Sequence, residues 1–177
     1  MPGKFPIFLD IKGKKIFVYG AGKIASRRVA SLLVFGPSVT VCAPKASEAI
    51  QRAAEDKKLV WLKEVYHPGS IPKDAWMILA ATNDPFINEE ICRECRKKHI
   101  LVNVCSDQTL CDFQFPGIVA KGDLVIGVNA GGKDHALASK WTDKIRKEVE
   151  KDGDDNQAET ASHIGESKKD GAGNPHG

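Results

Sequence analysis

Short apolar runs rich in β-branched residues alternate along this chain with amphipathic stretches of helical length. The runs have the length of buried strands, and the stretches between them have the length and spacing of helices. The apolar runs are 16–19, 39–42, 59–62, 76–81 and 101–105, and the helical stretches are 23–35, 47–56 and 85–98. Ser47 is the expected cap of the second helix. Strands joined by crossover helices lie parallel in one sheet. The alternation therefore predicts an α/β fold, a Rossmann-type parallel sheet with helices on both faces.

This rhythm changes after Asp112, where we expect a small α+β segment. Its expected elements are strands over 113–119 and 124–129, a turn at Lys121-Gly122-Asp123, and a helix over 135–149 that is capped by Asp134. From residue 152 onwards, polar residues and glycine dominate without any sustained period, which predicts disorder. The expected parts are thus a Rossmann domain over 1–112, the α+β segment over 113–151 and a disordered polar tail over 152–177.

Composition excludes several classes of protein. The chain has 177 residues, of which 42% are hydrophobic and 28% are charged, as in an ordinary globular protein. No apolar run approaches the roughly 20 residues that a membrane-spanning helix needs. Because the N-terminus also lacks the features of a secretory signal, we expect a cytoplasmic protein without a membrane partner. Five cysteines, an odd number, favour free thiols over a disulfide framework.

The net charge of +3 is unevenly distributed along the chain. Residues 1–150 carry 23 Lys or Arg against 17 Asp or Glu, whereas residues 151–177 carry 3 against 6. A basic body attracts anionic small molecules as readily as nucleic acid, but basic and aromatic residues do not interleave, so nucleic acid is not an expected partner. Lys23, Arg27 and Arg28 form either a solvated face or a cradle for a polycarboxylate, and composition favours the solvated face.

The first strand runs directly into Gly20-Ala21-Gly22-Lys23-Ile24-Ala25, a GxGxxA pattern that opens a helix. Gly20 permits the tight turn, Gly22 lets the backbone approach a pyrophosphate, and Ala25 keeps helix and strand close. The alternative is a glycine turn that binds no ligand. The GxGxxA pattern lies in the first strand-to-helix turn, and this position favours a dinucleotide site.

The choice between NAD and NADP stays open from spacing alone. The acidic residue that usually holds the adenosine ribose, about 20 positions further on, is missing. The second strand ends instead at Cys42-Ala43-Pro44-Lys45. Lys45 either favours a ribose phosphate, and hence NADP, or is simply a solvated lysine.

Polar residues follow the fourth and fifth strands at the carboxyl edge of the predicted sheet, where ligands of this fold bind. Thr82-Asn83-Asp84 follows the fourth strand, and Asp84 before Pro85 is also typical of a helix start. Ser106 and Asp107 follow the fifth strand. The Asp107 carboxylate either accepts a proton during the reaction or only caps a turn.

Cysteines raise two further possibilities, and we favour neither. Cys92, Cys95 and His99 lie on one helix face with a spacing that suits soft metal ligands, but no fourth ligand follows. Cysteine is a common core residue, so we expect a buried cluster and no metal site. Cys105 and Cys111 flank the loop after the fifth strand without an adjacent histidine, so neither is expected to act as a nucleophile.

Several segments together resemble the precorrin-2 dehydrogenase family, which forms the N-terminal module of siroheme synthase. The similarity extends from about Phe5 to Glu150. The similar segments are Phe5-Pro-Ile-Phe-Leu, Val18-Tyr-Gly-Ala-Gly-Lys-Ile-Ala, Ala80-Ala-Thr-Asn-Asp, Val102-Asn-Val, Leu110-Cys-Asp-Phe-Gln-Phe-Pro and Gly131-Gly-Lys. The last three are the specific part, because many folds share a GxGxxA turn.

The resemblance implies an enzyme of siroheme biosynthesis, an oxidoreductase that uses NAD to oxidise precorrin-2 to sirohydrochlorin. Hydride passes from the reduced tetrapyrrole to nicotinamide while a proton leaves. The resemblance also implies a homodimer that forms through the segment after the Rossmann domain, with the tetrapyrrole between the two parts. The alternatives are a chelatase activity that inserts a metal into sirohydrochlorin, in addition or instead, and a non-catalytic module that binds NAD or a tetrapyrrole.

The resemblance also assigns residues to the site. Cofactor contacts fall on Gly20, Ala21, Gly22, Lys23, Ile24, Pro44, Lys45, Thr82 and Asn83, and substrate contacts on Asn129, Gly131, Gly132 and Lys133. The proton-handling aspartate of the family falls on Ser106, with Asp107 beside it. A shift of one residue near a strand end points a side chain to the other side unless the loop rearranges. Asp107 is therefore the expected proton acceptor on condition of such a rearrangement, and Ser106 is the other catalytic candidate.

Overall fold

A computed structural model describes residues 4–132 and 134–166 of the chain, with the backbone alone for 152–166. The chain divides into two compact units, unit 1 (Met1–Phe115) and unit 2 (Pro116–Gly177). Each unit has a sheet of its own, five strands in unit 1 and two in unit 2.

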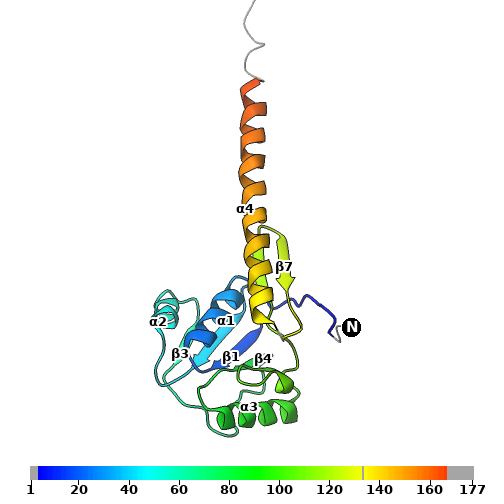
Figure 1. Ribbon diagram of the computed structural model, residues 1–177. Helices are drawn as coiled ribbons and strands as arrows, with labels where there is room; N and C mark the ends of the chain where they lie inside the picture. The colour runs from blue at the N-terminus through cyan, green and yellow to red at the C-terminus, as the bar shows by residue number, and fades with distance from the viewer. Residues whose placement is uncertain (1–3, 133, 167–177) are drawn as a thin grey trace, which may run out of the picture. The chain divides into compact units, whose positions relative to one another are not determined.

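The sheet of unit 1 is parallel throughout, as the alternation predicted (Figure 1). Its strands are β1 (Lys15–Tyr19), β2 (Ser38–Cys42), β3 (Val60–Leu62), β4 (Met77–Ala80) and β5 (Leu101–Val104). They lie in the order β3-β2-β1-β4-β5, so the direction of winding reverses between β1 and β4. A Rossmann-type sheet binds its ligand at this reversal, outside the carboxyl ends of the strands.

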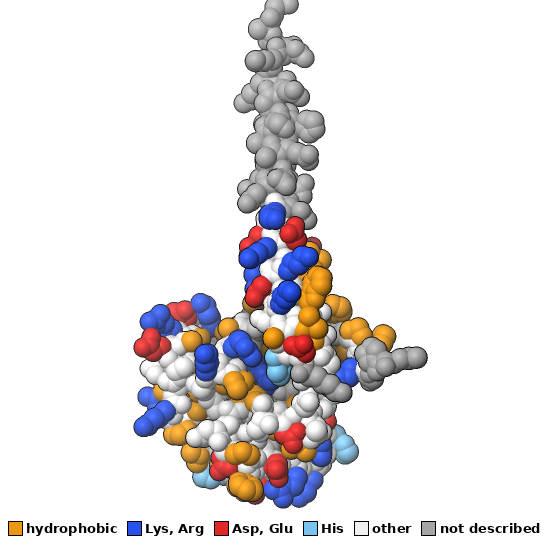
Figure 2. Space-filling view, viewed as in Figure 1, with side chains coloured by type: hydrophobic (Ala, Val, Ile, Leu, Met, Phe, Trp, Pro, Cys, Tyr) orange, Lys and Arg blue, Asp and Glu red, His pale blue; other side chains and the backbone are white. Residues whose placement is uncertain are grey.

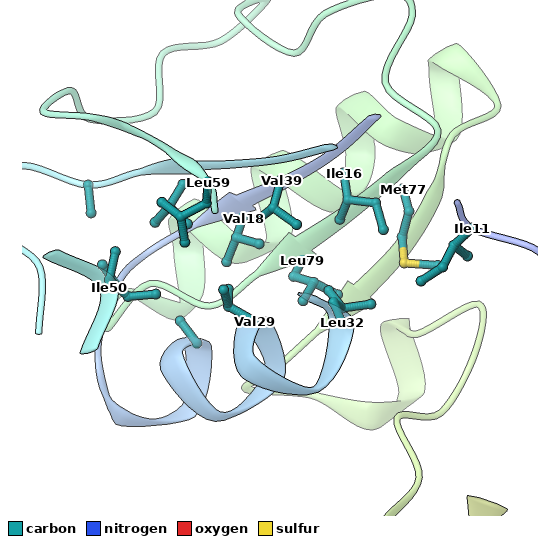
Figure 3. Close-up of a cluster of buried hydrophobic side chains, with 14 residues drawn as sticks. Ile11, Ile16, Val18, Val29, Leu32, Val39, Ile50, Leu59, Met77 and Leu79 are labelled. Carbon is teal, nitrogen blue, oxygen red and sulfur yellow. The ribbon is translucent and has the colours of Figure 1, made fainter. Parts of the chain in front are cut away.

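Helices cover both faces of this sheet. They are α1 (Lys23–Leu33), α2 (Glu48–Glu55) and α3 (Pro85–Lys98). Side chains alternate between the faces along each strand, so Val18 packs with Val29 of α1 and Ile50 of α2, whereas Tyr19 packs on the face that Ile91 of α3 covers. Figure 3 shows the first of these clusters, with the apolar side of α1 turned towards the sheet. The fold class expected from the sequence is therefore confirmed.

Two of the helices begin at the caps that the sequence indicated. The Ser47 hydroxyl accepts a hydrogen bond from the Ile50 amide at the start of α2. The Asp84 carboxylate accepts from the amides of Phe86 and Ile87, at 2.9 and 3.4 Å, and Pro85 takes the first helical position of α3. These side chains satisfy backbone donors that a helix end otherwise leaves unpaired.

The connection from β3 to β4 contains no helix and is fastened by one carboxylate. Glu94 of α3 accepts hydrogen bonds from the Tyr66 hydroxyl at 2.7 Å and from the amides of Gly69 and Ile71 at 2.9 and 3.1 Å. Lys98 forms an ion pair with the same carboxylate. The Tyr66 ring packs edge-on against Tyr19, with 5.4 Å between the ring centroids. The connection is thus tied to the sheet face that α3 covers.

The expectation of a strand from Phe113 is wrong, because residues 112–115 are bound to unit 1. The Asp112 carboxylate accepts from the Val102 amide at 2.9 Å, and the Asn103 amide group donates to the Phe113 carbonyl at 2.8 Å. Both Phe113 and Phe115 pack against the core cluster of unit 1. The next strand accordingly begins only at Gly117, and the two units divide at Phe115 where a boundary near Asp112 was expected.

Unit 2 is an antiparallel hairpin with a helix packed against it. Its elements are β6 (Gly117–Lys121), β7 (Leu124–Val128) and α4 (His135–Glu166). Gly122 has a φ of +56° in the hairpin turn. The Asp134 carboxylate accepts from the Leu137 amide at 2.8 Å, so Asp134 caps α4 as expected. Within the described residues, no helix is both long and apolar enough to cross a membrane.

The last helix continues further than the sequence pattern suggested. We expected a helix over 135–149 and disorder from 152, but the helical backbone runs on to Glu166. No proline interrupts this stretch, and adding residues to an existing helix costs far less than starting a new one. Residues 167–177 of the expected tail lie outside the described part of the chain.

Candidate functional site: the carboxyl edge of the parallel sheet

Gly20 ends β1 at the point where the sheet reverses its winding. Its φ is +104°, a conformation that residues with a side chain rarely adopt. A Cβ at this position would lie 2.2 Å from the Ala81 carbonyl oxygen and 2.8 Å from the Thr82 nitrogen. The Gly20 amide also donates to the Cys42 carbonyl at 2.9 Å. Glycine is therefore required here, because the ends of β1 and β2 and the chain after β4 approach one another closely.

Gly22 serves a different purpose two residues later. It is the N-cap of α1, has an ordinary extended backbone, and supplies no side-chain cap. Apart from Gly22 itself and its neighbours along the chain, no described atom lies within 4 Å of the place where its Cβ would stand. The first turn of α1 contains no acidic residue, and Lys23 is exposed there. An uncapped helix start beside open space and a lysine fits the pyrophosphate of a dinucleotide.

The loop after β2 is held against this glycine turn. The Ser47 amide donates to the Ala21 carbonyl at 3.1 Å, and the hydroxyls of Ser26 and Ser47 lie 2.7 Å apart. Pro44 and Lys45, between the end of β2 and this contact, are exposed. The structure thus brings the predicted cofactor residues of the first two loops together.

The loop after β4 contains the remaining residues predicted to contact the cofactor, Thr82 and Asn83. Thr82 follows the Ala81 carbonyl that approaches Gly20, and its hydroxyl donates to the Asn88 side-chain oxygen at 2.8 Å. The neighbouring Asn83 is exposed. Asn88 is completely buried, and its amide group also donates to the Ser106 hydroxyl at 3.1 Å. One buried side chain therefore connects the loops that follow β4 and β5.

Ser106 and Asp107 differ in what they contact. The exposed Asp107 carboxylate caps a short 3-10 helix (Gln108–Leu110) and accepts from the amide and the hydroxyl of Thr109, at 2.8 and 2.7 Å. These hydrogen bonds from Thr109 lower the pKa of Asp107 below its ordinary value. Asp107 is accordingly a carboxylate at neutral pH, whereas Ser106 is a neutral hydroxyl bonded to Asn88.

Arg28 of α1 reaches the end of β5 and is not part of a free cradle. Its guanidinium donates to the Asn103 side-chain oxygen and, at 2.8 Å, to the Cys105 sulfur. It also lies over the Phe115 ring, 5.3 Å from the centroid. Burial raises the pKa of the Cys105 thiol, although Arg28 acts in the opposite direction. Lys23 and Arg27, by contrast, are exposed.

The cysteines of α3 are core residues, as expected. Cys92 and Cys95 are buried among apolar side chains on one face of the sheet, and burial raises the pKa of Cys95 to about 12. His99 is exposed at the end of the helix, in a left-handed conformation. In the part of the chain that the structure describes, no group of three or more His, Cys, Asp or Glu is placed to hold a metal ion.

The residues expected to contact substrate belong to unit 2. Asn129 is exposed after β7, and Gly131 and Gly132 both have positive φ values, +69° and +76°, before α4. Apart from Gly131 itself and its neighbours along the chain, no described atom lies within 4 Å of a Cβ placed on Gly131. Lys133 lies outside the described residues. These glycines form a left-handed loop with open space beside it.

Most of unit 1 matches a known family of dinucleotide-binding proteins. Residues 7–117 match a family model described as "Putative NAD(P)-binding", which covers nearly all of unit 1 and the glycine turn. The chain belongs to this NAD(P)-binding family. The dinucleotide cofactor expected from the sequence is therefore confirmed.

Individual relatives then narrow the family. The chain is 34% identical to a multifunctional siroheme biosynthesis protein of Ruminiclostridium josui, over 82% of this chain and 28% of that protein. It is 31% identical to siroheme synthase 1 of Serratia proteamaculans, over 79% of this chain and 29% of that protein. The chain thus spans less than a third of the length of these relatives.

A solved structure agrees with these relatives. The precorrin-2 dehydrogenase SirC superposes with a TM-score of 0.69 at 26% identity, over 82% of this chain and 70% of that one. The expected resemblance to the precorrin-2 dehydrogenase and siroheme synthase family is confirmed.

One residue of the site, Asn88, was missed by sequence reasoning. It shares a helix face with Ile91, Cys92 and Cys95, at spacings of three, four and seven residues. A polar residue on an apolar helix face needs hydrogen-bond partners in the interior. That signal was present in the sequence, but the partners, Thr82 and Ser106, could be recognised only from the fold.

Proposed function

We propose that the chain catalyses the NAD-dependent dehydrogenation of precorrin-2 to sirohydrochlorin, a step of siroheme biosynthesis. Bound NAD supplies the acceptor for a hydride from the reduced macrocycle. One further proton leaves the macrocycle, so the products are sirohydrochlorin, NADH and a proton. The protein binds the dinucleotide at the carboxyl edge of unit 1 and orients the macrocycle against it.

The observation that carries this proposal is the open start of α1 at Gly22, within a unit that resembles a precorrin-2 dehydrogenase. Gly20 brings the loops after β1 and β4 into contact, and the space at Gly22 leaves room for a pyrophosphate. The missing acidic residue after β2 is compatible with either dinucleotide. The dehydrogenase neighbour supports NAD.

Asp107 is the proton acceptor in this proposal. Asp107 is a carboxylate at neutral pH, so it carries a lone pair that can take a proton, unlike the Ser106 hydroxyl. The hydrogen bonds that lower its pKa also make it a weaker base. The hydrogen bonds from Thr109 use part of its acceptor capacity, and a carboxylate has room for about four such bonds. Substrate contacts by Asn129, Gly131, Gly132 and Lys133 also belong to the proposal.

The direct test supplies precorrin-2 with NAD or NADP under anaerobic conditions and follows NADH or NADPH absorbance together with sirohydrochlorin formation. We expect turnover with NAD. Folded protein that binds NAD but leaves precorrin-2 unchanged would contradict the proposal.

Substitution of Asp107 tests the proton acceptor separately. Asp107→Asn keeps an oxygen that can accept from Thr109 but removes the basic carboxylate, so we expect turnover to fall about a hundredfold with unchanged affinity for NAD. Thr109→Val is the matched control, because it removes one hydrogen bond and retains the carboxylate. An unaltered rate in Asp107→Asn would exclude Asp107 as the acceptor.

Unit 2 supports the homodimer that the proposal includes. Among its described residues, only Val119 and Thr142 are buried, whereas Leu124, Leu137 and Trp141 are about half exposed. Figure 2 shows hydrophobic side chains gathered along one side of this unit, next to α4. A two-stranded hairpin with so small a core is marginal in water unless another surface covers it. A second copy of the chain offers such a surface.

Sedimentation or light scattering tests the dimer. Trp141→Glu places a charge on the exposed apolar side of unit 2, and we expect the unaltered chain to be dimeric and the variant monomeric. Lys144→Glu, one turn along the same helix on an exposed position, is the control and leaves a dimer. A monomeric unaltered chain would contradict this part of the proposal.

A non-catalytic module is the second candidate, and one observation favours it. The position of the family aspartate holds Ser106, and the neighbouring carboxylate of Asp107 already caps a turn. Such a module would bind NAD and sirohydrochlorin tightly without forming NADH.

We also propose a cytoplasmic location, which the five free thiols support, since a reducing compartment keeps cysteines in this form.

A further inference from the structure

Asn88 is a fully buried amide that joins the two loops of the candidate site. Its oxygen accepts from the Thr82 amide at 3.0 Å and from the Thr82 hydroxyl at 2.8 Å. Its nitrogen donates to the Thr82 carbonyl at 3.2 Å and to the Ser106 hydroxyl oxygen at 3.1 Å. Every hydrogen-bonding position of this amide is used, so its orientation is fixed by both loops.

The hydrogen bond from Asn88 determines whether the Ser106 hydroxyl donates or accepts a hydrogen bond toward a ligand. A hydroxyl has one proton to donate and two lone pairs to accept with. Asn88 donates to the Ser106 oxygen, and within the described residues no protein group accepts the Ser106 proton. Because Ser106 is exposed at the carboxyl edge, this proton is available to a ligand there.

We propose that Asn88 is a positioning residue that holds Ser106 as a hydrogen-bond donor to a carboxylate of the tetrapyrrole and keeps it in register with the cofactor loop at Thr82. The inference rests on the proposed function. A hydroxyl donor forms a short, strong hydrogen bond with a carboxylate. The serine thus suits a substrate with many carboxylates.

The substitution Asn88→Asp tests the direction of this hydrogen bond. At low pH a neutral carboxyl group can donate to Ser106 as the amide does. At high pH the ionised carboxylate accepts the Ser106 proton instead and withdraws it from the ligand. We therefore expect sirohydrochlorin affinity, relative to the unaltered chain at the same pH, to be nearly unchanged at low pH and about tenfold weaker at high pH.

Variants of Ser106 complete the test, with affinity measured by titration of sirohydrochlorin absorbance. Ser106→Ala should bind about tenfold more weakly at every pH, and Ser106→Thr, which retains the hydroxyl, should restore affinity. In the double variant Asn88→Asp/Ser106→Ala the added pH dependence should disappear. Ile91→Val, equally buried on the same helix face, controls for a general loss of stability.

Three results would overturn the inference: tight binding by Ser106→Ala, an added pH dependence that survives in the double variant, or no such dependence in folded Asn88→Asp. Failure of the unaltered chain to bind sirohydrochlorin would instead contradict the proposed function. In that case NAD titration still tests the contact with Thr82. Asn88→Ala should weaken NAD binding several-fold because Thr82 is released, and equal affinity would overturn the inference as well.

Discussion

Gly20 and Gly22 are two residues apart in one motif, yet the structure requires them for different reasons. Gly20 is fixed by contacts within the protein, because its φ is positive and the Ala81 backbone leaves no room for a side chain. Gly22 is not fixed in this way, since both its backbone and the space around it would accept a Cβ. A glycine without a structural need indicates that something else approaches the chain there.

Alanine at the two positions should therefore change different properties, stability at Gly20 and NAD affinity at Gly22. Gly20→Ala should destabilise the fold by about 3 kcal/mol, because it combines backbone strain with a clash against the Ala81 carbonyl. Gly22→Ala should fold with nearly unchanged stability but bind NAD more weakly. Chemical unfolding and NAD titration measure the two effects, and comparable destabilisation by both substitutions would refute the distinction.

Glu94 gives the fold a pH dependence of its own. Burial acts to raise its pKa, but hydrogen bonds from Lys98, Tyr66, Gly69 and Ile71 outweigh burial, so the pKa is lower than its ordinary value of 4.5. A carboxyl group whose pKa is lowered on folding stabilises the protein above its unfolded pKa. That contribution is lost as the pH falls through the folded pKa, because the carboxylate is then protonated.

Replacement of Glu94 should accordingly cost stability most at neutral pH. Glu94→Ala leaves several donors of the β3-to-β4 connection without an acceptor, and we expect a loss on the order of 2 kcal/mol near neutrality and less in acid. Urea unfolding across the acid range measures it, with the exposed Glu48→Ala as the control. A loss that is independent of pH would show that the carboxylate charge has no part in the effect.

At the scale of the elements, unit 2 depends on one close contact between a strand and a helix. A Cβ on Gly117 of β6 would lie 2.1 Å from the Thr142 hydroxyl oxygen of α4. The same strand and helix are joined by Arg146, which donates to the Ile118 carbonyl at 3.4 Å, and by Lys121, which donates to the Val149 carbonyl at 2.6 Å. The small size of Gly117 thus lets α4 lie against β6.

Gly117→Ala should force this contact apart. We expect a loss of about 2 kcal/mol, since the clash is with a side chain in a tightly packed place. Removal of the hydroxyl in Gly117→Ala/Thr142→Ala should recover much of that loss, whereas additive losses in the double variant would contradict the proposed contact. Thermal unfolding of the two single variants and the double variant measures the coupling.

The elements of unit 1 could be predicted from the sequence because their signals are local. The period of the apolar residues, the caps at Ser47 and Asp84, and the glycine turn all act over a few residues. The start of β6 could not be found in this way, because Phe113 and Phe115 have strand-like side chains but are used by the core of unit 1. The link from Asn88 to Thr82 and Ser106 likewise depends on where the fold brings distant residues.

For the molecule as a whole, the distribution of charge agrees with the anionic ligands that we propose. The net charge of +3 comes from a basic body of residues 1–150 and an acidic remainder. Lys23 at the start of α1 and Lys45 in the loop after β2 are both exposed at the sheet edge where the dinucleotide is expected. An anionic cofactor and a substrate with many carboxylates both suit such a body. Membership of the NAD(P)-binding family agrees with a dinucleotide cofactor, and the tetrapyrrole belongs to the proposed function.

The most direct test of the proposed dehydrogenase activity is a single-turnover reaction with the protein in excess over precorrin-2 and with NAD present. We expect one NADH for each sirohydrochlorin formed, and Gly22→Asp should abolish both together, because an added carboxylate repels the pyrophosphate. Sirohydrochlorin formed without NADH, or folded protein that binds NAD and leaves precorrin-2 unchanged, would contradict the proposed activity.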